Sequence, residues 1–167
     1  MRPLLGASRR AATVGAILLL AGCQSPLGPN ASFPVAIETA TLASNELNRL
    51  GTQDLEAGNS GLAERHFREA VEQNGDDAAS WIGLAAAYDS LGRFDLADRA
   101  YAQAIRLNGE TLTIQNNVGY SYFLRGDRAR ALSRFQRALG LYPANPVLLN
   151  NIKMVRTGER PNRGGMP

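Results

Sequence analysis

The fold is decided by residues 78–111, which read AASWIGLAAAYDSLGRFDLADRAYAQAIRLNGET. The same kinds of residue recur before and after this stretch at a constant 34-residue step, with no insertion or deletion across residues 44–145. Such a step predicts a solenoid, in which each repeat packs only against its neighbours. The recurring positions are Gly58, Gly92 and Gly126; Ala63, Ala97 and Ala131; Phe67, Tyr101 and Phe135; and Ala70, Ala104 and Ala138.

Each repeat is predicted to be a pair of α-helices. Its apolar side chains follow a spacing of three and four residues, as Ala97, Tyr101 and Ala104 do, which places them on one face of a helix. The glycine in the middle of each repeat suits the left-handed conformation in which many helices end, because glycine has no Cβ. The alanines allow two helices to approach closely, and the aromatic residue fills the space beside them.

This pattern resembles the tetratricopeptide repeat. The first copy is degenerate, with Asp54 where an aromatic residue is expected. The resemblance implies an all-α solenoid of three helix-turn-helix repeats, followed by a C-terminal capping helix that covers the last one. The signature residues are Trp81, Leu84, Tyr88, Gly92, Ala97, Tyr101 and Ala104 in the second copy, and Val118, Gly119, Tyr122, Ala131, Phe135, Ala138 and Pro143 in the third.

The repeat arithmetic also predicts the boundaries of the parts, and seven helices in all. Repeat one covers 44–77, repeat two 78–111 and repeat three 112–145. The capping helix covers 146–156, where Leu148, Leu149, Ile152 and Val155 are apolar. Residues 157–167 are predicted to be a disordered tail.

The N-terminal residues predict export and lipid attachment. Residues 1–22 combine three arginines with a short apolar segment, as a cleaved signal peptide does. Leu20-Ala21-Gly22-Cys23 matches the bacterial lipobox, so Cys23 is the expected site of lipidation (diacylglycerol and palmitate), with 23–43 as a tether. The alternative is an uncleaved anchor helix with an incidental cysteine. Gln24, in place of the aspartate that retains enteric lipoproteins at the inner membrane, predicts the outer membrane, facing the periplasm.

Composition excludes several classes of function. The chain has 18 basic and 15 acidic residues, and three of the basic ones lie in the leader, so the mature chain is neutral. Neutrality argues against nucleic-acid binding. One cysteine and one histidine exclude a disulfide within the chain and the usual zinc sites. Neither a G-x-S-x-G elbow nor a phosphate-binding loop occurs, so we expect no enzyme, no cofactor and no metal. His66 is expected at the surface, and Trp81 in the core.

The resemblance implies a concave groove lined by the first helix of each repeat. Asparagines recur there and can donate to and accept from a peptide backbone, which favours a protein partner. The alternative is that they are ordinary solvated helix residues. The family's groove positions fall on Asn48, Thr52 and Leu55; on Ile82, Ala86 and Asp89; on Asn116, Tyr120 and Phe123; and on Asn150 of the capping helix.

A second candidate surface is basic. Residues 44–111 hold twelve acidic residues and six arginines, whereas residues 112–167 hold two acidic and nine basic residues. The excess predicts a docking surface for an acidic partner or for lipid headgroups, with a solvated helix face as the alternative. The arginines that would form it are Arg125, Arg128, Arg130, Arg134 and Arg137.

A finer resemblance bears on function. The run Asn116-Asn117-Val118-Gly119-Tyr120-Ser121-Tyr122, leading into Arg125-Gly126-Asp127, resembles the tight-adherence (Flp) pilus assembly lipoprotein family. The architecture is also similar to that of the pilotins of type IV pili. The resemblance implies a scaffold that helps a secretin or another pilus component to assemble. The alternative is an adaptor that recruits a cell-wall hydrolase or protease to its substrate. A homodimer through the degenerate first repeat is a further expectation.

Overall fold

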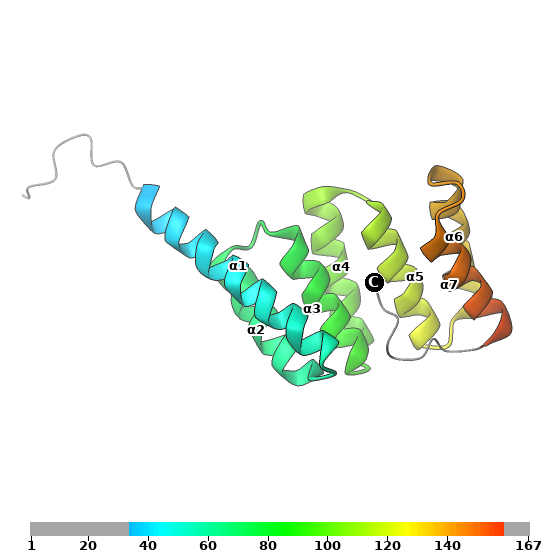
Figure 1. The fold of residues 1–167 in the computed structure, drawn as a ribbon, viewed down its shortest axis with the longest axis horizontal. Coiled ribbons are helices and arrows are strands. Elements are labelled where there is room, and N and C mark those ends of the chain that lie inside the picture. Colours follow the sequence, from blue (N-terminus) through cyan, green and yellow to red (C-terminus); the bar gives the residue numbers. More distant parts are fainter. Residues whose placement is uncertain (1–33, 159–167) are drawn as a thin grey trace, which may run out of the picture. The chain divides into compact units, whose positions relative to one another are not determined.

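The computed structural model describes residues 34–158, and their side chains from Ala43 onward. These residues form seven α-helices, which confirms the all-α fold (Figure 1). The predicted signal peptide, Cys23 and residues 159–167 of the predicted tail lie outside the described residues. The helices are α1 (Pro34–Glu56), α2 (Ser60–Gln73), α3 (Ala78–Ser90), α4 (Phe94–Asn108), α5 (Leu112–Leu124), α6 (Arg128–Leu141) and α7 (Pro146–Thr157).

The helices pack as consecutive hairpins. α1 packs with α2, α3 with α4 and α5 with α6, and α7 then packs on α6 (Figure 1). The first helices of successive repeats are also in contact, α1 with α3, α3 with α5 and α5 with α7. We call the surface formed by α1, α3, α5 and α7 the first-helix surface. The three hairpins and the single covering helix are those that the repeat step predicts.

The first helix begins inside the predicted tether. The tether is predicted over 23–43, and α1 begins at Pro34. Proline suits the first position of a helix because its missing N–H would have no partner there. From Val35 to Ser44 the sequence contains neither glycine nor a second proline, so nothing interrupts the helix. At the other end, α7 extends one residue beyond the predicted 156 and is closed by Gly158, in the left-handed conformation.

The turns inside the hairpins agree with the predicted role of glycine. Gly58, Gly92 and Gly126 all have positive φ, of 78°, 70° and 84°. That region costs little only for a residue without a Cβ. A recurring turn in the backbone therefore accompanies the recurring glycine in the sequence.

The core forms two apolar clusters that meet along α5. The first joins repeats one and two and includes Ile114 and Val118 of α5. The second joins repeat three and α7 and includes Phe123 near the end of α5. Trp81 is partly buried against the first cluster, and its Nε1 donates to the Gly75 carbonyl over 2.8 Å. The join between the two clusters carries the polar side chains described below.

Candidate partner-binding site

The first-helix surface carries most of the predicted groove residues, but not all of them. Asn48 is half-buried on α1, and its Nδ2 donates to Ser80 Oγ on α3 over 2.9 Å. Thr52 is exposed, and its hydroxyl donates to the Asn48 carbonyl over 2.9 Å. The other residues of the set that are half-buried, and thus partly reachable from solvent, are Leu55, Ile82, Ala86, Asn116 and Tyr120.

Asp89 and Phe123 were predicted to line the groove, and the structure contradicts both assignments. Asp89 is only 6% exposed and Phe123 only 8%. Both lie in the last turn of a first helix, where the next first helix covers them, α5 over Asp89 and α7 over Phe123. The Phe123 ring packs at a tilt against Tyr120, with centroids 6.1 Å apart. The sequence register alone does not show that the next first helix covers these two side chains.

The capping helix contributes a different asparagine from the predicted one. Asn151 Nδ2 donates to Asn116 Oδ1 over 2.7 Å, and Asn151 is only 8% exposed. Asn150, the residue in register with the earlier repeats, is exposed on α7. Because α7 and α5 are separate helices, the rotation of one relative to the other decides whether Asn150 or Asn151 contacts Asn116. The repeat register leaves that choice open.

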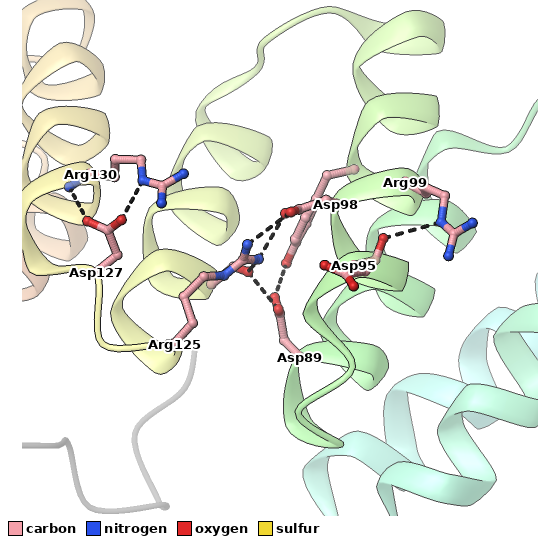
Figure 2. Close-up of polar contacts among 9 residues, drawn as sticks. Asp89, Asp95, Asp98, Arg99, Arg125, Asp127 and Arg130 are labelled. Carbon is pink, nitrogen blue, oxygen red and sulfur yellow. Dashed lines mark hydrogen bonds and ion pairs between the residues drawn. The ribbon is translucent and has the colours of Figure 1, made fainter.

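Asp89 is a buried carboxylate at the join between repeats two and three (Figure 2). Tyr101 donates its hydroxyl to Asp89 Oδ2 over 3.0 Å, and Ser121 donates to Oδ1 over 2.6 Å. Burial raises the pKa of Asp89 from 3.8 to about 6, although the two hydroxyl donors and Arg125 oppose the rise. Burial, with the negative charge of Asp89 beside it, raises the pKa of Tyr101 as well.

Arg125 closes the same join from the end of α5 (Figure 2). Its guanidinium donates to both carboxylate oxygens of Asp98 on α4, over 2.8 and 2.9 Å, and to Ser121 Oγ over 2.7 Å. It also lies over the rings of Phe94 and Tyr122, at 4.9 and 5.1 Å from their centroids. This geometry fixes the guanidinium between repeats, since planar bidentate pairing and ring stacking constrain it together.

Three of the five arginines of the predicted basic docking surface pair with acidic residues of the same chain. Arg125 is held as described, Arg130 pairs with Asp127 and lies over the Tyr122 ring, and Arg134 pairs with Glu110 over 2.9 Å. Arg128 and Arg137 form no ion pair with any residue in the described range. The acidic partners are 27, 3 and 24 residues from these arginines in sequence, so only the Asp127 pair was within reach of local reasoning.

The join between repeats one and two has a similar clamp that the sequence did not reveal. Glu64 on α2 is buried, and its carboxylate accepts from Arg93 of the second repeat over 2.7 Å and from Arg68 of its own helix. Glu64 and Asp98 occupy the same register position in successive repeats, so an acid stands at that position at both joins. That coincidence was the signal that sequence analysis could have used.

His66 was expected at the surface, but it is partly buried and pairs with Asp54 of α1. Its side chain is 19% exposed, and its Nδ1 lies 2.8 Å from Asp54 Oδ2. Asp54 occupies the place of the repeat's usual aromatic residue. The pair therefore explains how the degenerate repeat accommodates a carboxylate there. No group of three or more potential metal-ligating residues occurs within residues 34–158.

The repeats are confirmed by comparison with known families. The model of the tetratricopeptide repeat matches residues 48–97 and 83–146, which is more than half of the chain. This chain belongs to the tetratricopeptide-repeat family. A stacked-repeat fold of this kind leaves an extended surface for other proteins, which supports a role as a protein–protein interaction scaffold.

One curated relative shares part of the sequence. The cytochrome c-type biogenesis protein CycH of Bradyrhizobium diazoefficiens is 34% identical over 79 residues. The match covers 46% of this chain and only 21% of CycH. The match thus spans about a fifth of the relative's length, so the similarity concerns only a part of each protein.

Solved structures share the fold at low sequence identity. The Arabidopsis OM64 tetratricopeptide domain has a TM-score of 0.62 and 22% identity, covering 72% of this chain and 99% of that one. Pseudomonas aeruginosa pilF has a TM-score of 0.61 and 24% identity, covering 72% and 55%. The Yersinia enterocolitica type III secretion chaperone SycD, in complex with a peptide of the translocator YopD, has a TM-score of 0.56 and 17% identity, covering 70% and 94%.

Proposed function

We propose that this chain is a lipid-anchored scaffold of the bacterial cell envelope that holds a segment of a partner protein on its first-helix surface. The observation that carries the proposal is the composition of that surface. The apolar residues Ile82, Ala86 and Tyr120 are half-buried in the second and third repeats, and the polar Asn48 and Thr52 lie on the first. Such a surface can bury apolar side chains of a peptide and hydrogen-bond its backbone.

The chemistry of this surface favours an uncharged or apolar peptide segment. None of the predicted groove residues is a cation, so the groove residues provide no clamp for a terminal carboxylate. Thr52 is exposed, and its hydroxyl oxygen still has lone pairs with which to accept from a peptide N–H. The SycD chaperone, which has the same fold, is bound to a peptide of its translocator. By analogy, we expect the partner of this chain to offer a short segment.

The proposed anchor is a lipid on Cys23, at the periplasmic face of the outer membrane. The lipobox Leu20-Ala21-Gly22-Cys23 supports it, as does the glutamine that follows. Two or more acyl chains are needed for stable anchoring, which lipoprotein processing would supply. Among the described helices, none has the length and apolar character needed to cross a membrane.

We assign the scaffold to the assembly of a pilus or secretion machine, with a secretin or a pilus component as partner. The run from Asn116 to Asp127 and its resemblance to the tight-adherence pilus lipoproteins support this assignment. A second candidate is the assembly of c-type cytochromes, which the 34% identity to CycH favours. Recruitment of a cell-wall hydrolase or protease is the remaining alternative, with the same anchor and the same surface.

Crosslinking in intact cells, followed by purification through a C-terminal tag and mass spectrometry, tests the proposal. A secretin or pilus protein supports the first assignment, a cytochrome c assembly protein the second, and a hydrolase or protease the third. Tyr120→Ala combined with Ile82→Ser should reduce capture at least about ten-fold, since two apolar contacts are lost. Gln136→Ala, at an exposed position of α6, is the matched control. Unchanged capture by the first variant, with an unchanged helical spectrum, would exclude the first-helix surface.

A further inference from the structure

Three exposed apolar side chains lie in the loop between α6 and α7 or within one helical turn of it. Leu141 is 64% exposed, Tyr142 40% and Leu149 48%. Leu141 ends α6, Tyr142 begins the loop, and Leu149 lies in the first turn of α7, where its N–H donates to the Asn145 carbonyl over 3.1 Å. The other large apolar residues exposed to this degree in the described range, Leu62 and Leu91, lie on α2 and just after α3. An exposed apolar surface at one loop is typical of an interaction site.

Leu149 is exposed because of its place in the repeat. It occupies the register position that Gln115 and Trp81 hold in the two preceding repeats, where the first is buried and the second partly buried. α7 is the last helix that the structure describes, so none of the described helices completes a hairpin with it. Because no described helix pairs with α7 in a hairpin, the leucine at this position keeps 48% of its surface exposed.

Hydrogen bonds hold the backbone of the loop. The Tyr142 N–H donates to the Ala138 carbonyl over 2.9 Å, and Asn145 Oδ1 accepts from the N–H groups of Val147 and Leu148, both over 3.1 Å. Ala144 has a φ of 64°, the one positive φ outside glycine in the described range. That conformation is strained for alanine, and strain of this kind is retained where the surroundings or a function require it.

Two cations each lie about one helical turn from an exposed apolar residue, on the side away from the loop. From Arg128 to Gly158 the sequence has six basic residues and no acidic one. Arg137 precedes Leu141 by four residues on α6, and Lys153 follows Leu149 by four on α7. Both are exposed, and neither forms an ion pair with another described residue. With a rise of about 1.5 Å per helical residue, each cation lies about 6 Å behind the apolar residue on its own helix.

We propose that the α6–α7 loop is a docking site for an anionic phospholipid surface. Leu141, Tyr142 and Leu149 reach the boundary of the acyl chains, while Arg137 and Lys153 meet the lipid phosphates. A separation of about 6 Å matches the depth of about 5–10 Å to which amphipathic segments enter a bilayer interface. Tyrosine is itself typical of that interface. An acidic protein surface would satisfy the cations but would leave three apolar side chains at the loop without an apolar environment. The docking site requires neither lipidation of Cys23 nor the first-helix surface.

Vesicle binding tests the proposal with the chain that begins at Gln24. The described helices all belong to one compact unit, Phe33–Pro167, so a chain that begins at Gln24 keeps that unit whole and lacks both leader and lipid. The probe is a vesicle of one part phosphatidylglycerol to two parts phosphatidylcholine, compared with phosphatidylcholine alone, in a co-sedimentation assay. Because a cation near an anionic membrane changes partitioning about five-fold, Arg137→Gln with Lys153→Gln should weaken binding about 25-fold. Leu141→Ser with Leu149→Ser should weaken it at least about ten-fold.

Matched controls remove the same chemistry elsewhere. Leu62→Ser and Arg65→Gln act on exposed residues of α2 and should leave vesicle binding unchanged. Insertion is read directly from a probe, since Cys23 is the only cysteine and the tested chain lacks it. An environment-sensitive dye on Leu149→Cys should shift to the blue with anionic vesicles, whereas the same dye on Leu62→Cys should not.

Several results would overturn the proposal. One is the absence of binding to the anionic vesicles, and another is an equal effect of the controls and the loop variants. A third is an unshifted dye at position 149. Self-association, or binding of an acidic helical peptide that needs the same residues while vesicles do not bind, would assign the loop to a protein instead. None of these results bears on partner capture by the first-helix surface, which the crosslinking experiment tests.

Discussion

Replacing Asp89 by asparagine should stabilise the protein at neutral pH and leave it little changed in acid. The carboxylate is buried, and its pKa in the folded chain is about 6, against 3.8 for the free side chain. Asparagine is nearly isosteric and has no charge to desolvate. Its oxygen can accept from Ser121, and its amide can donate to the Tyr101 hydroxyl, which can turn to accept.

The magnitude follows from the difference between the two pKa values. A shift of about two units corresponds to about 3 kcal/mol between the charged and the protonated forms. The folded state binds the proton more tightly than the unfolded state, so the wild-type protein loses stability as the pH rises. The contribution of Asp89 to the free energy of unfolding is fully present below pH 3.8, falls between pH 3.8 and about pH 6, and is lost above about pH 6. The variant should therefore gain up to about 3 kcal/mol relative to wild type at pH 7.5.

Urea unfolding followed by circular dichroism, at several values of pH from 4 to 7.5, measures this difference. The quantity to plot is the unfolding free energy of Asp89→Asn minus that of the wild type. It should rise across the interval in which Asp89 ionises and then level off. Asp76→Asn removes an exposed carboxylate and controls for the change in net charge. A difference that does not vary with pH, or one that falls as the pH rises, would refute the reasoning.

Three further predictions concern packing, the repeat join and the anchor. Gly83→Ala should destabilise the protein by about 1–3 kcal/mol, because the new Cβ would lie 2.2 Å from a ring carbon of Phe67. Gly140→Ala has open space around the new Cβ and should stabilise the protein by about 0.5–1 kcal/mol in the same urea assay. Equal effects would contradict the packing argument. Arg125→Lys should lose about 1 kcal/mol, since an ammonium cannot pair with both carboxylate oxygens and stack on two rings; an unfolding free energy equal to wild type would show that the clamp adds nothing. Cys23→Ser should abolish incorporation of labelled palmitate in growing cells, and a serine variant that is still labelled would disprove lipidation at this residue.

The candidate site was only partly accessible to sequence reasoning. Register placed Asn48, Ile82 and Tyr120 on the first-helix surface, because residues of one helix face recur with the helical period. The same register misplaced Asp89, which the next first helix covers. It also offered Asn150 where Asn151 makes the contact with α5. These errors share a cause, since each depends on how two helices are rotated against one another.

The charge pattern shows the same division. The sequence correctly indicated that basic residues accumulate after Leu112, but it gave no information on their partners. Arg125 reaches Asp98 and Arg134 reaches Glu110 across a repeat boundary, so both are engaged within the fold. Arg137 and Lys153 keep their charge exposed to solvent. A count of charges along the chain cannot separate these two groups.

The sequence by itself determined the number of repeats, the pairing of helices and the turns. These depend on local periodicity and on glycines such as Gly92, which adopt the left-handed backbone conformation at little cost. The tertiary structure alone decided which polar groups are buried and which charges are neutralised. Asp89, Glu64 and His66 look alike as solvated helix residues in the sequence, yet Asp89 and Glu64 are buried and the His66 side chain is only 19% exposed. Burial and ion pairing depend on distances between side chains far apart in the chain, and only the packing of one helix against another fixes those distances.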